Sequence, residues 1–170
     1  FSSEYHRQNP ENVIYYDNGF NKFVTNSKEQ KLNGEVVIFA QAGLRDVKKE
    51  SLEQLVINCL RDGIGMAGGR ILSDRGELLY GRKELDESGS CVYADAGLPK
   101  GFTGYFHKAI LQQNCEGVSY RLFAIRRDLL EAWKQEGELS SEESMQQLCS
   151  FVTQMGYRIS YVPEATAILR

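Results

Sequence analysis

Cysteine and histidine are the residue types in this chain that could bind a soft metal or form a covalent cross-link. The chain has four cysteines and two histidines among its 170 residues. The cysteines lack the Cys-x-x-Cys spacing of zinc and redox motifs, and His6 and His107 lie far apart without a nearby cysteine. The pattern argues against a zinc site and favours buried or idle thiols in a reducing cytoplasm over disulfides. The cysteines are Cys59, Cys91, Cys115 and Cys149.

The composition is that of an ordinary globular domain. Hydrophobic residues make up 42% and charged residues 25% of the chain, and its length suits one domain spanning residues 1–170. The net charge is −3, and no Lys/Arg cluster approaches the density of a nucleic-acid footprint. The longest apolar segment, residues 36–40, is far shorter than a membrane-spanning helix. We therefore expect neither a nucleic-acid partner nor a membrane span.

Helical and strand-like patterns alternate along the chain, which is typical of the α/β class. Residues 35–40, in which Glu35 precedes the continuous apolar segment, predict a central strand that is covered on both faces. We expect Ser51 to cap a helix, Pro163 to end the last strand, and residues 81–117 to form a long excursion. The other predicted strands are 13–16, 65–72, 118–125 and 157–162, and the predicted helices are 20–32, 51–61, 127–136 and 142–155.

Several segments resemble family 2 glycosyltransferases in the same order along the chain. Residues 156–165, GYRISYVPEA, resemble the family's closing segment GYRIVYVPEA, which follows a helix. Residues 33–43, NGEVVIFAQAG, resemble a strand that begins A-x-G-E and ends D-x-D. Residues 65–72 and 118–127 resemble GAVGGRLL and VTGACLAIRR. The resemblance covers most of residues 20–169.

The resemblance implies a GT-A-like, three-layer α/β/α sandwich with a mixed central sheet that lacks the family's first strands. Those strands would precede Phe1, and a chain that starts at Phe1 is expected to be part of a longer parent. Active relatives transfer a sugar from a nucleotide donor, usually with inversion, to a glycan or lipid-linked acceptor. Their usual role is bacterial cell-surface polysaccharide synthesis, so the resemblance implies a cytoplasmic, bacterial setting. It also implies as partners a sugar nucleotide, a glycan, another glycosyltransferase or the rest of the parent chain.

The family's metal-binding positions have lost their carboxylates in this chain. In active members the D-x-D aspartates hold a divalent cation against the donor diphosphate, because hard cations prefer anionic oxygen ligands. Gln41 and Gly43 occupy these positions, and Asp46 is a possible surrogate that would bind Mn²⁺ or Mg²⁺. A solvated loop is the commoner explanation for Asp46. The substrate-binding positions that the resemblance implies are Asn26, Gln41, Gly43, Gly69 and Arg70.

The position of the catalytic base has changed in the same way. Inverting members use an aspartate in a pattern like E-D-x-D-L-C to deprotonate the acceptor hydroxyl. Residues 144–149 read SMQQLC, so Met145 and Gln147 stand at the acidic positions, and a glutamine amide is not basic near neutral pH. Glu142 and Glu143 are possible surrogates, although the helix dipole alone favours acids in a first turn.

The resemblance and its missing acids lead to three hypotheses about function. The first is a degenerate glycosyltransferase-like domain, a pseudoenzyme that binds a sugar nucleotide, a glycan or a partner transferase with weak or no catalysis and no cofactor. The second is an active inverting transferase that uses Asp46, Glu142 or Glu143 together with Mn²⁺ or Mg²⁺. The third is a structural interaction module. Loss of a positioned general base typically costs roughly 100- to 10,000-fold in rate, which favours the first.

Overall fold

The structure of the chain is a computed structural model. The residues that it describes are 13–17 (backbone only), 35–41, 43–99, 101–133, 139 and 141–169. The predicted helix over residues 20–32 and the predicted site residue Asn26 lie outside this part of the chain.

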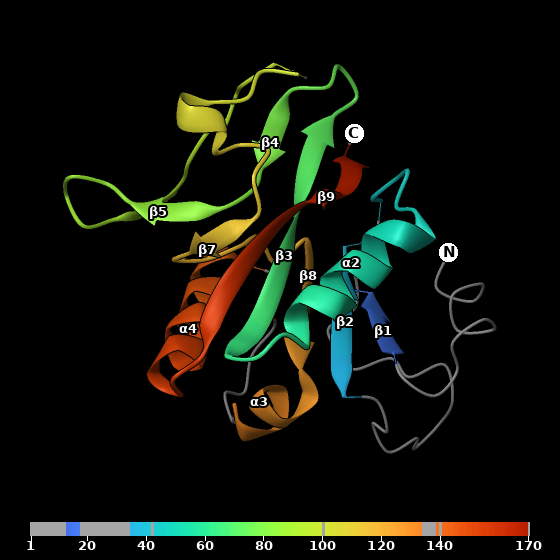
Figure 1. The fold of residues 1–170 in the computed structure, drawn as a ribbon, viewed down its shortest axis with the longest axis vertical. Coiled ribbons are helices and arrows are strands. Elements are labelled where there is room, and N and C mark those ends of the chain that lie inside the picture. The colour runs from blue at the N-terminus through green and yellow to red at the C-terminus, as the bar shows by residue number, and fades with distance from the viewer. Residues whose placement is uncertain are drawn as a thin grey trace.

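A mixed sheet of seven strands forms the centre of the fold (Figure 1). The strands follow the order β1-β2-β8-β3-β9-β7. The seventh strand, β4, pairs with Ile71 and Leu72 of β3. β1 and β2 are parallel, as are β3 and β9, whereas the other pairs are antiparallel. The strands are β1 (Val13–Asp17), β2 (Val36–Ala40), β3 (Ile64–Ser73), β4 (Leu78–Tyr80), β7 (Gln113–Cys115), β8 (Leu122–Arg126) and β9 (Arg158–Leu169). The mixed sheet and the internal position of the 35–40 strand are confirmed.

Helices cover the sheet on both faces. Helix α2 (Lys49–Cys59) lies on one face, and α3 (Arg127–Ala132) and α4 (Glu142–Gln154) lie on the other (Figure 1). Because side chains alternate along a strand, Val36 and Ile38 of β2 pack in the core beneath α2, and Val37 and Phe39 pack in the core beneath α3 and α4. A core on each face of the sheet confirms the predicted α/β class and the arrangement of helices on both sides of the sheet.

A two-stranded hairpin, β5 (Lys83–Leu85) and β6 (Cys91–Tyr93), projects from the sheet. The Asp86 carboxylate shapes its turn by accepting hydrogen bonds from the Ser88 and Ser90 amides. A 3₁₀ turn, η1 (Tyr105–His107), precedes β7. The predicted excursion over 81–117 therefore contains short strands that its weak periodicity did not reveal. Among the helices that the structure describes, none is long and apolar enough to cross a bilayer.

Two predicted helix and strand starts differ from those observed. Lys48 is the N-cap of α2, and no side chain caps this helix; Ser51 is buried inside the first turn. The Lys49–Glu53 ion pair, one helical turn apart, accompanies the earlier start. Strand β8 begins at residue 122 rather than 118, and Val118 instead packs against the core side of β3.

Pro163 does not end the last strand, so that prediction was wrong. The β3–β9 register pairs Gly68 with Tyr161 and Arg70 with Thr166, so that residues 162–165 lie opposite Gly69 alone. Pro163 falls within this irregular stretch, where its missing amide hydrogen removes no regular ladder bond. The strand resumes its pairing after the irregularity and continues to residue 169.

Candidate functional site

The end of β2 carries Gln41, one of the positions where the family places an anionic ligand. The backbone amide of Gln41 donates a hydrogen bond to the backbone carbonyl of Arg121 over 2.8 Å. This bond holds the end of β2 against the residue that precedes β8. The side-chain oxygen of Gln41 is buried and has no hydrogen-bond partner among the described residues. A buried acceptor without a donor is costly, and a ligand hydroxyl or amide could satisfy it.

The residues after β2 do not form a fitting site for a hard divalent cation. Gln41 offers only a neutral carbonyl, and Gly43 has a positive φ of 88° and no side chain. Asp46 is exposed, as expected of a loop residue, and its φ is 53°. Among the residues that the structure describes, no three His, Cys, Asp or Glu side chains gather around a possible metal position. The donor set at this strand end therefore lacks the anionic oxygens that Mn²⁺ or Mg²⁺ requires.

Arg121 connects the end of β2 with the start of α4. Its carbonyl accepts the hydrogen bond from Gln41, and its guanidinium Nη1 donates to Glu142 Oε1 over 2.7 Å. The Arg121 Nε atom is buried and has no hydrogen-bond partner in the described part of the chain. Two of the predicted site positions therefore contact the same arginine, Gln41 through the backbone and Glu142 through the guanidinium.

Glu142 is the centre of a polar group that we name the Glu142 cluster, made of Lys83, Tyr93, Arg121 and Glu142. Lys83 and Arg121 form ion pairs with the carboxylate, and the Tyr93 hydroxyl donates to it over 2.7 Å. The side chain of Lys83 is 5% exposed and that of Arg121 is 13% exposed, whereas Glu142 is 42% exposed. Two nearly buried cations thus share one carboxylate that still reaches the surface, and the cluster keeps a net positive charge.

The environment of Glu142 makes it a good acceptor and a weak base. Burial opposes its charge, but the hydrogen bonds from Lys83 and Tyr93 and the positive charge of Lys83 outweigh burial, so the pKa of the carboxyl is lowered. An efficient general base has a pKa near the working pH. A carboxylate stabilised in this way holds its neighbours in place more effectively than it removes a proton.

Aromatic rings surround the guanidinium of Arg121. The Arg121 Cζ atom lies 3.8 Å from the centroid of the Tyr80 ring and 4.2 Å from that of Tyr120. The Tyr80 and Tyr93 rings meet edge to face at 5.2 Å. Burial raises the pKa of Tyr93, so its hydroxyl remains a donor at neutral pH. Cation–π contacts and ion pairing therefore fix Arg121 on both sides.

The aligned base positions lie away from the Glu142 cluster. Met145 is fully buried in the core beneath α4. Gln147 is exposed, and five residues along a helix place it about 140° around the axis from Glu142. Gln147 lines an open hollow of about 680 Å³ together with Glu143 and other residues of α4. Trp133, which follows α3, also lines it. The structure therefore separates Gln147 and Glu143 from Glu142.

Gly69 and Arg70, two other predicted site residues, lie on β3. A Cβ atom on Gly69 would lie 2.5 Å from the Ala165 carbonyl oxygen and 2.9 Å from Leu122 Cδ2, so this glycine permits the close approach of β9. The Arg70 guanidinium binds the Thr166 hydroxyl over 3.2 Å. Gly69 therefore has a packing role, and Arg70 does not belong to the Glu142 cluster.

The sequence did not indicate the cationic and aromatic members of the Glu142 cluster. Lys83 and Tyr93 lie in the weakly periodic 81–117 segment, and Arg121 lies just before a strand. Lys83 and Tyr93 meet Glu142 because the β5–β6 hairpin packs against the amino end of α4, and Arg121 reaches it from the residue before β8. Of the four members of the cluster, the sequence indicated Glu142 alone, as an acid in the first turn of a predicted helix.

The cysteines do not form a reactive group. All four are free, and Cys59 and Cys149 are buried. Burial raises the pKa of the Cys59 thiol to about 12 and that of Cys149 to about 11. A thiol is nucleophilic only as the thiolate, so these two side chains are inert packing groups at neutral pH.

Comparison with known proteins gives a distant relative. No protein-family model matches the chain. The chain is 24% identical over 144 residues to "Uncharacterized protein y4gI" of Sinorhizobium fredii (strain NBRC 101917 / NGR234). The similarity covers 84% of this chain and 16% of that protein, so the chain spans less than a fifth of the length of its relative. The chain is thus similar to one segment of a much longer bacterial protein.

Proposed function

We propose that the chain is most of a degenerate, GT-A-like glycosyltransferase domain that binds a sugar nucleotide, a glycan or a partner transferase, with weak or no catalysis. The observation that carries this proposal is the junction between β2 and α4. Gln41, at the expected ligand position, follows the strand and has a buried side-chain oxygen with no partner among the described residues, and Glu142 pairs with two cations and accepts a hydrogen bond from a hydroxyl. These two features support a transferase-like site whose anionic groups have been replaced.

A sugar nucleotide is the occupant that the junction favours. Among the described residues, the Gln41 side-chain oxygen has no donor and Arg121 Nε has no acceptor, and a sugar nucleotide carries both kinds of complementary group, hydroxyls and anionic oxygens. The Tyr80 and Tyr120 rings add flat apolar surface beside the Arg121 guanidinium. Bacterial cell-surface glycan synthesis is the setting that this proposal implies, as is a cytoplasmic location.

The second candidate is an active transferase that uses rearranged acids. One observation favours it: Glu142 is partly exposed and lies beside the arginine that contacts the end of β2. Asp46 has no comparable partner in the described part of the chain, which makes it the weaker surrogate.

We expect uridine diphosphate to bind without a requirement for metal. Because Gln41 and Gly43 supply no anionic oxygen, excess Mn²⁺ should change its affinity by less than about 3-fold, whereas a bridging metal would add charge-assisted contacts. Calorimetric titration of uridine diphosphate with Mn²⁺ or with EDTA measures this difference. Asp46→Ala is the test variant, and Asp74→Ala, in the exposed turn after β3, is the control.

Two outcomes would contradict the proposal in different ways. A tight one-to-one Mn²⁺ site that Asp46→Ala removes and Asp74→Ala preserves would support the rearranged transferase. No saturable binding of uridine, guanosine or thymidine diphosphates would contradict the donor site and leave the structural interaction module.

A further inference from the structure

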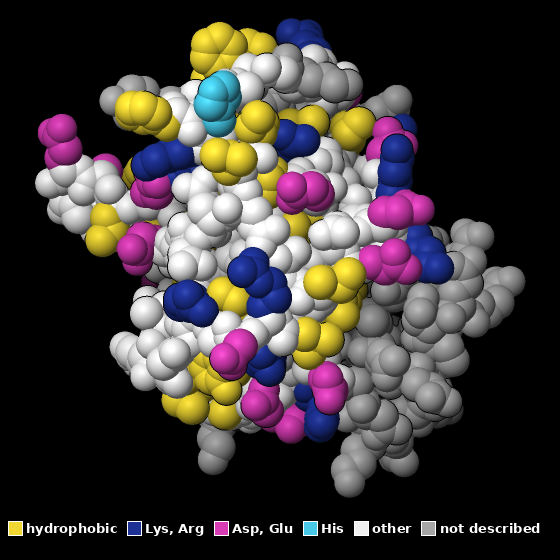
Figure 2. Space-filling view, viewed as in Figure 1, with side chains coloured by type: hydrophobic (Ala, Val, Ile, Leu, Met, Phe, Trp, Pro, Cys, Tyr) yellow, Lys and Arg dark blue, Asp and Glu magenta, His cyan; other side chains and the backbone are white. Residues whose placement is uncertain are grey.

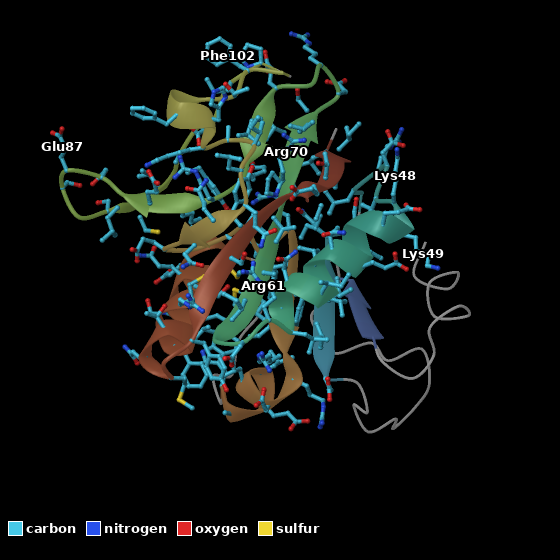
Figure 3. All side chains as sticks on the ribbon, in the orientation of Figure 1. Lys48, Lys49, Arg61, Arg70, Glu87 and Phe102 are labelled. Carbon is cyan, nitrogen blue, oxygen red and sulfur yellow. The ribbon has the colours of Figure 1, made fainter. Side chains whose placement is uncertain are left out.

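We propose that a second site, separate from the Glu142 cluster, binds a small organic acid or organic phosphate with an apolar body. The site is a cavity of about 240 Å³ between the β3–β4 hairpin and the segment from residue 98 to residue 110. Arg70 lies in its wall, and the rest of the wall is predominantly apolar. Figure 3 labels Arg70 on β3 and Phe102 on the segment above it. Binding at this cavity does not depend on whether the Glu142 cluster belongs to a transferase-like site.

The floor of the cavity is a small core of its own. Leu72, Leu78 and Ala109 are buried together, and Leu98 packs against them. Backbone hydrogen bonds from Leu78 to Leu98 and from Gly97 to Leu78 hold the two segments in place. The floor is therefore preformed, as expected of a ligand site rather than of a gap between loose loops.

The rim of the cavity leaves apolar surface uncovered. Phe102 is 62% exposed and Ile110 is 39% exposed, and both line the cavity. Figure 2 shows apolar side chains gathered at this upper end of the molecule. A ligand with an aliphatic or aromatic body would cover part of both side chains, and removal of that surface from water favours binding.

Arg70 sets the charge of the expected ligand. Within the described part of the chain, its guanidinium bonds only with the Thr166 hydroxyl, through Nε at 3.4 Å and Nη2 at 3.2 Å. No salt bridge to Arg70 is found in the described part of the chain, and Asp95 pairs with Arg82 over 2.7 Å. Guanidinium groups bind carboxylate and phosphate through parallel hydrogen bonds, so the unmatched charge selects an anion.

The size of the cavity limits the body of the ligand. Pockets for drug-sized ligands occupy about 300–1,000 Å³, and this cavity is smaller. A chain of several carbon atoms or a single ring with one acidic group matches both the volume and Arg70, the cation among the described lining residues. A neutral alcohol would lose the contact with Arg70, and inorganic phosphate would lose the apolar contacts.

The test is calorimetric titration with hexyl phosphate and hexanoate, with hexanol and inorganic phosphate as partial ligands. We expect at least one of the two amphipathic acids to bind one-to-one and at least 10-fold more tightly than either partial ligand. Arg70→Gln should weaken that binding by about 10-fold or more, which is the loss of a charge-assisted pair. Phe102→Ala should weaken it by a few-fold.

Thr166→Val is the matched control, because it removes the partner of Arg70 within the chain and leaves the guanidinium. Circular dichroism confirms that each variant is folded. If Thr166→Val retains binding while Arg70→Gln loses it, Arg70 contacts the ligand directly. The proposal is overturned if the folded wild-type chain binds neither hexyl phosphate nor hexanoate saturably, or binds both equally well after Arg70→Gln.

Discussion

Replacing Gly68 by alanine is expected to destabilise the folded chain by about 4 kcal/mol or more, which is enough to unfold many domains. A Cβ atom at this position would lie 2.2 Å from Val118 Cβ and 2.4 Å from its Cγ1. Val118 is fully buried, and β3 is paired on both sides, with β8 and β9. Neither side of the contact can move without breaking a ladder or opening the core.

Urea denaturation followed by circular dichroism measures this effect, and Val118→Gly provides the background that isolates the clash. In that background the added methyl group has space, so Gly68→Ala should cost less than about 1 kcal/mol. An equal cost in both backgrounds would show that the clash with Val118 is not the cause. The close packing of Gly68 matters for function because it fixes the segment that leads into Tyr120 and Arg121.

Substituting Glu142 by glutamine should lower the free energy of unfolding by about 2–3 kcal/mol at neutral pH. Breaking a fully buried ion pair costs about 3–5 kcal/mol because one charge is left uncompensated. Lys83 and Arg121 are nearly buried, but Glu142 is 42% exposed, and solvent screening reduces the expected cost. Glu143→Gln removes a neighbouring first-turn acid that lies outside the Glu142 cluster, so it should cost less than about 1 kcal/mol.

The pH dependence of the Glu142→Gln effect has a definite sign. The pKa of Glu142 is lowered in the folded chain from an ordinary value of 4.5, so its stabilisation is fully present above that value. It should be lost as the pH falls through the lowered pKa, because protonation removes the charge that Lys83 and Arg121 require. Chemical denaturation of both variants from pH 7 to pH 3 measures the difference. A wild-type advantage that grows on acidification would contradict this assignment.

The central elements could be predicted because their signals are local. The apolar run of β2 and the spacing of Leu52, Leu55 and Cys59 in α2 identify buried faces without knowledge of their partners. The acids and spacing at the start of α4 identify a helix in the same way. Pairing between distant segments leaves no such signal. The continuation of β9 through Pro163 depends on a register irregularity opposite Gly69, which belongs to β3.

The candidate site could be predicted only at the positions that a resemblance marks. Gln41 and Glu142 were predicted from the sequence, and in the structure Gln41 bonds with the Arg121 backbone and Glu142 with its guanidinium. Lys83 could not be predicted, because a lysine near a turn is usually solvated. It is buried here because the β5–β6 hairpin folds against α4 and the Glu142 carboxylate compensates its charge.

Turnover tests most directly our proposal that the chain is a transferase-like scaffold without the chemistry of a transferase. The measurement is release of nucleoside diphosphate from uridine, guanosine and thymidine sugar nucleotides, with acceptor glycans and Mn²⁺ present. It should be made on this chain and on a longer protein that contains it. We predict neither transfer nor donor hydrolysis above background, since Gln41 and Gly43 offer no anionic metal ligand and Gln147 offers no base. Robust turnover that Glu142→Gln abolishes in a folded variant, and that Glu143→Gln preserves, would contradict the claim and establish a rearranged enzyme.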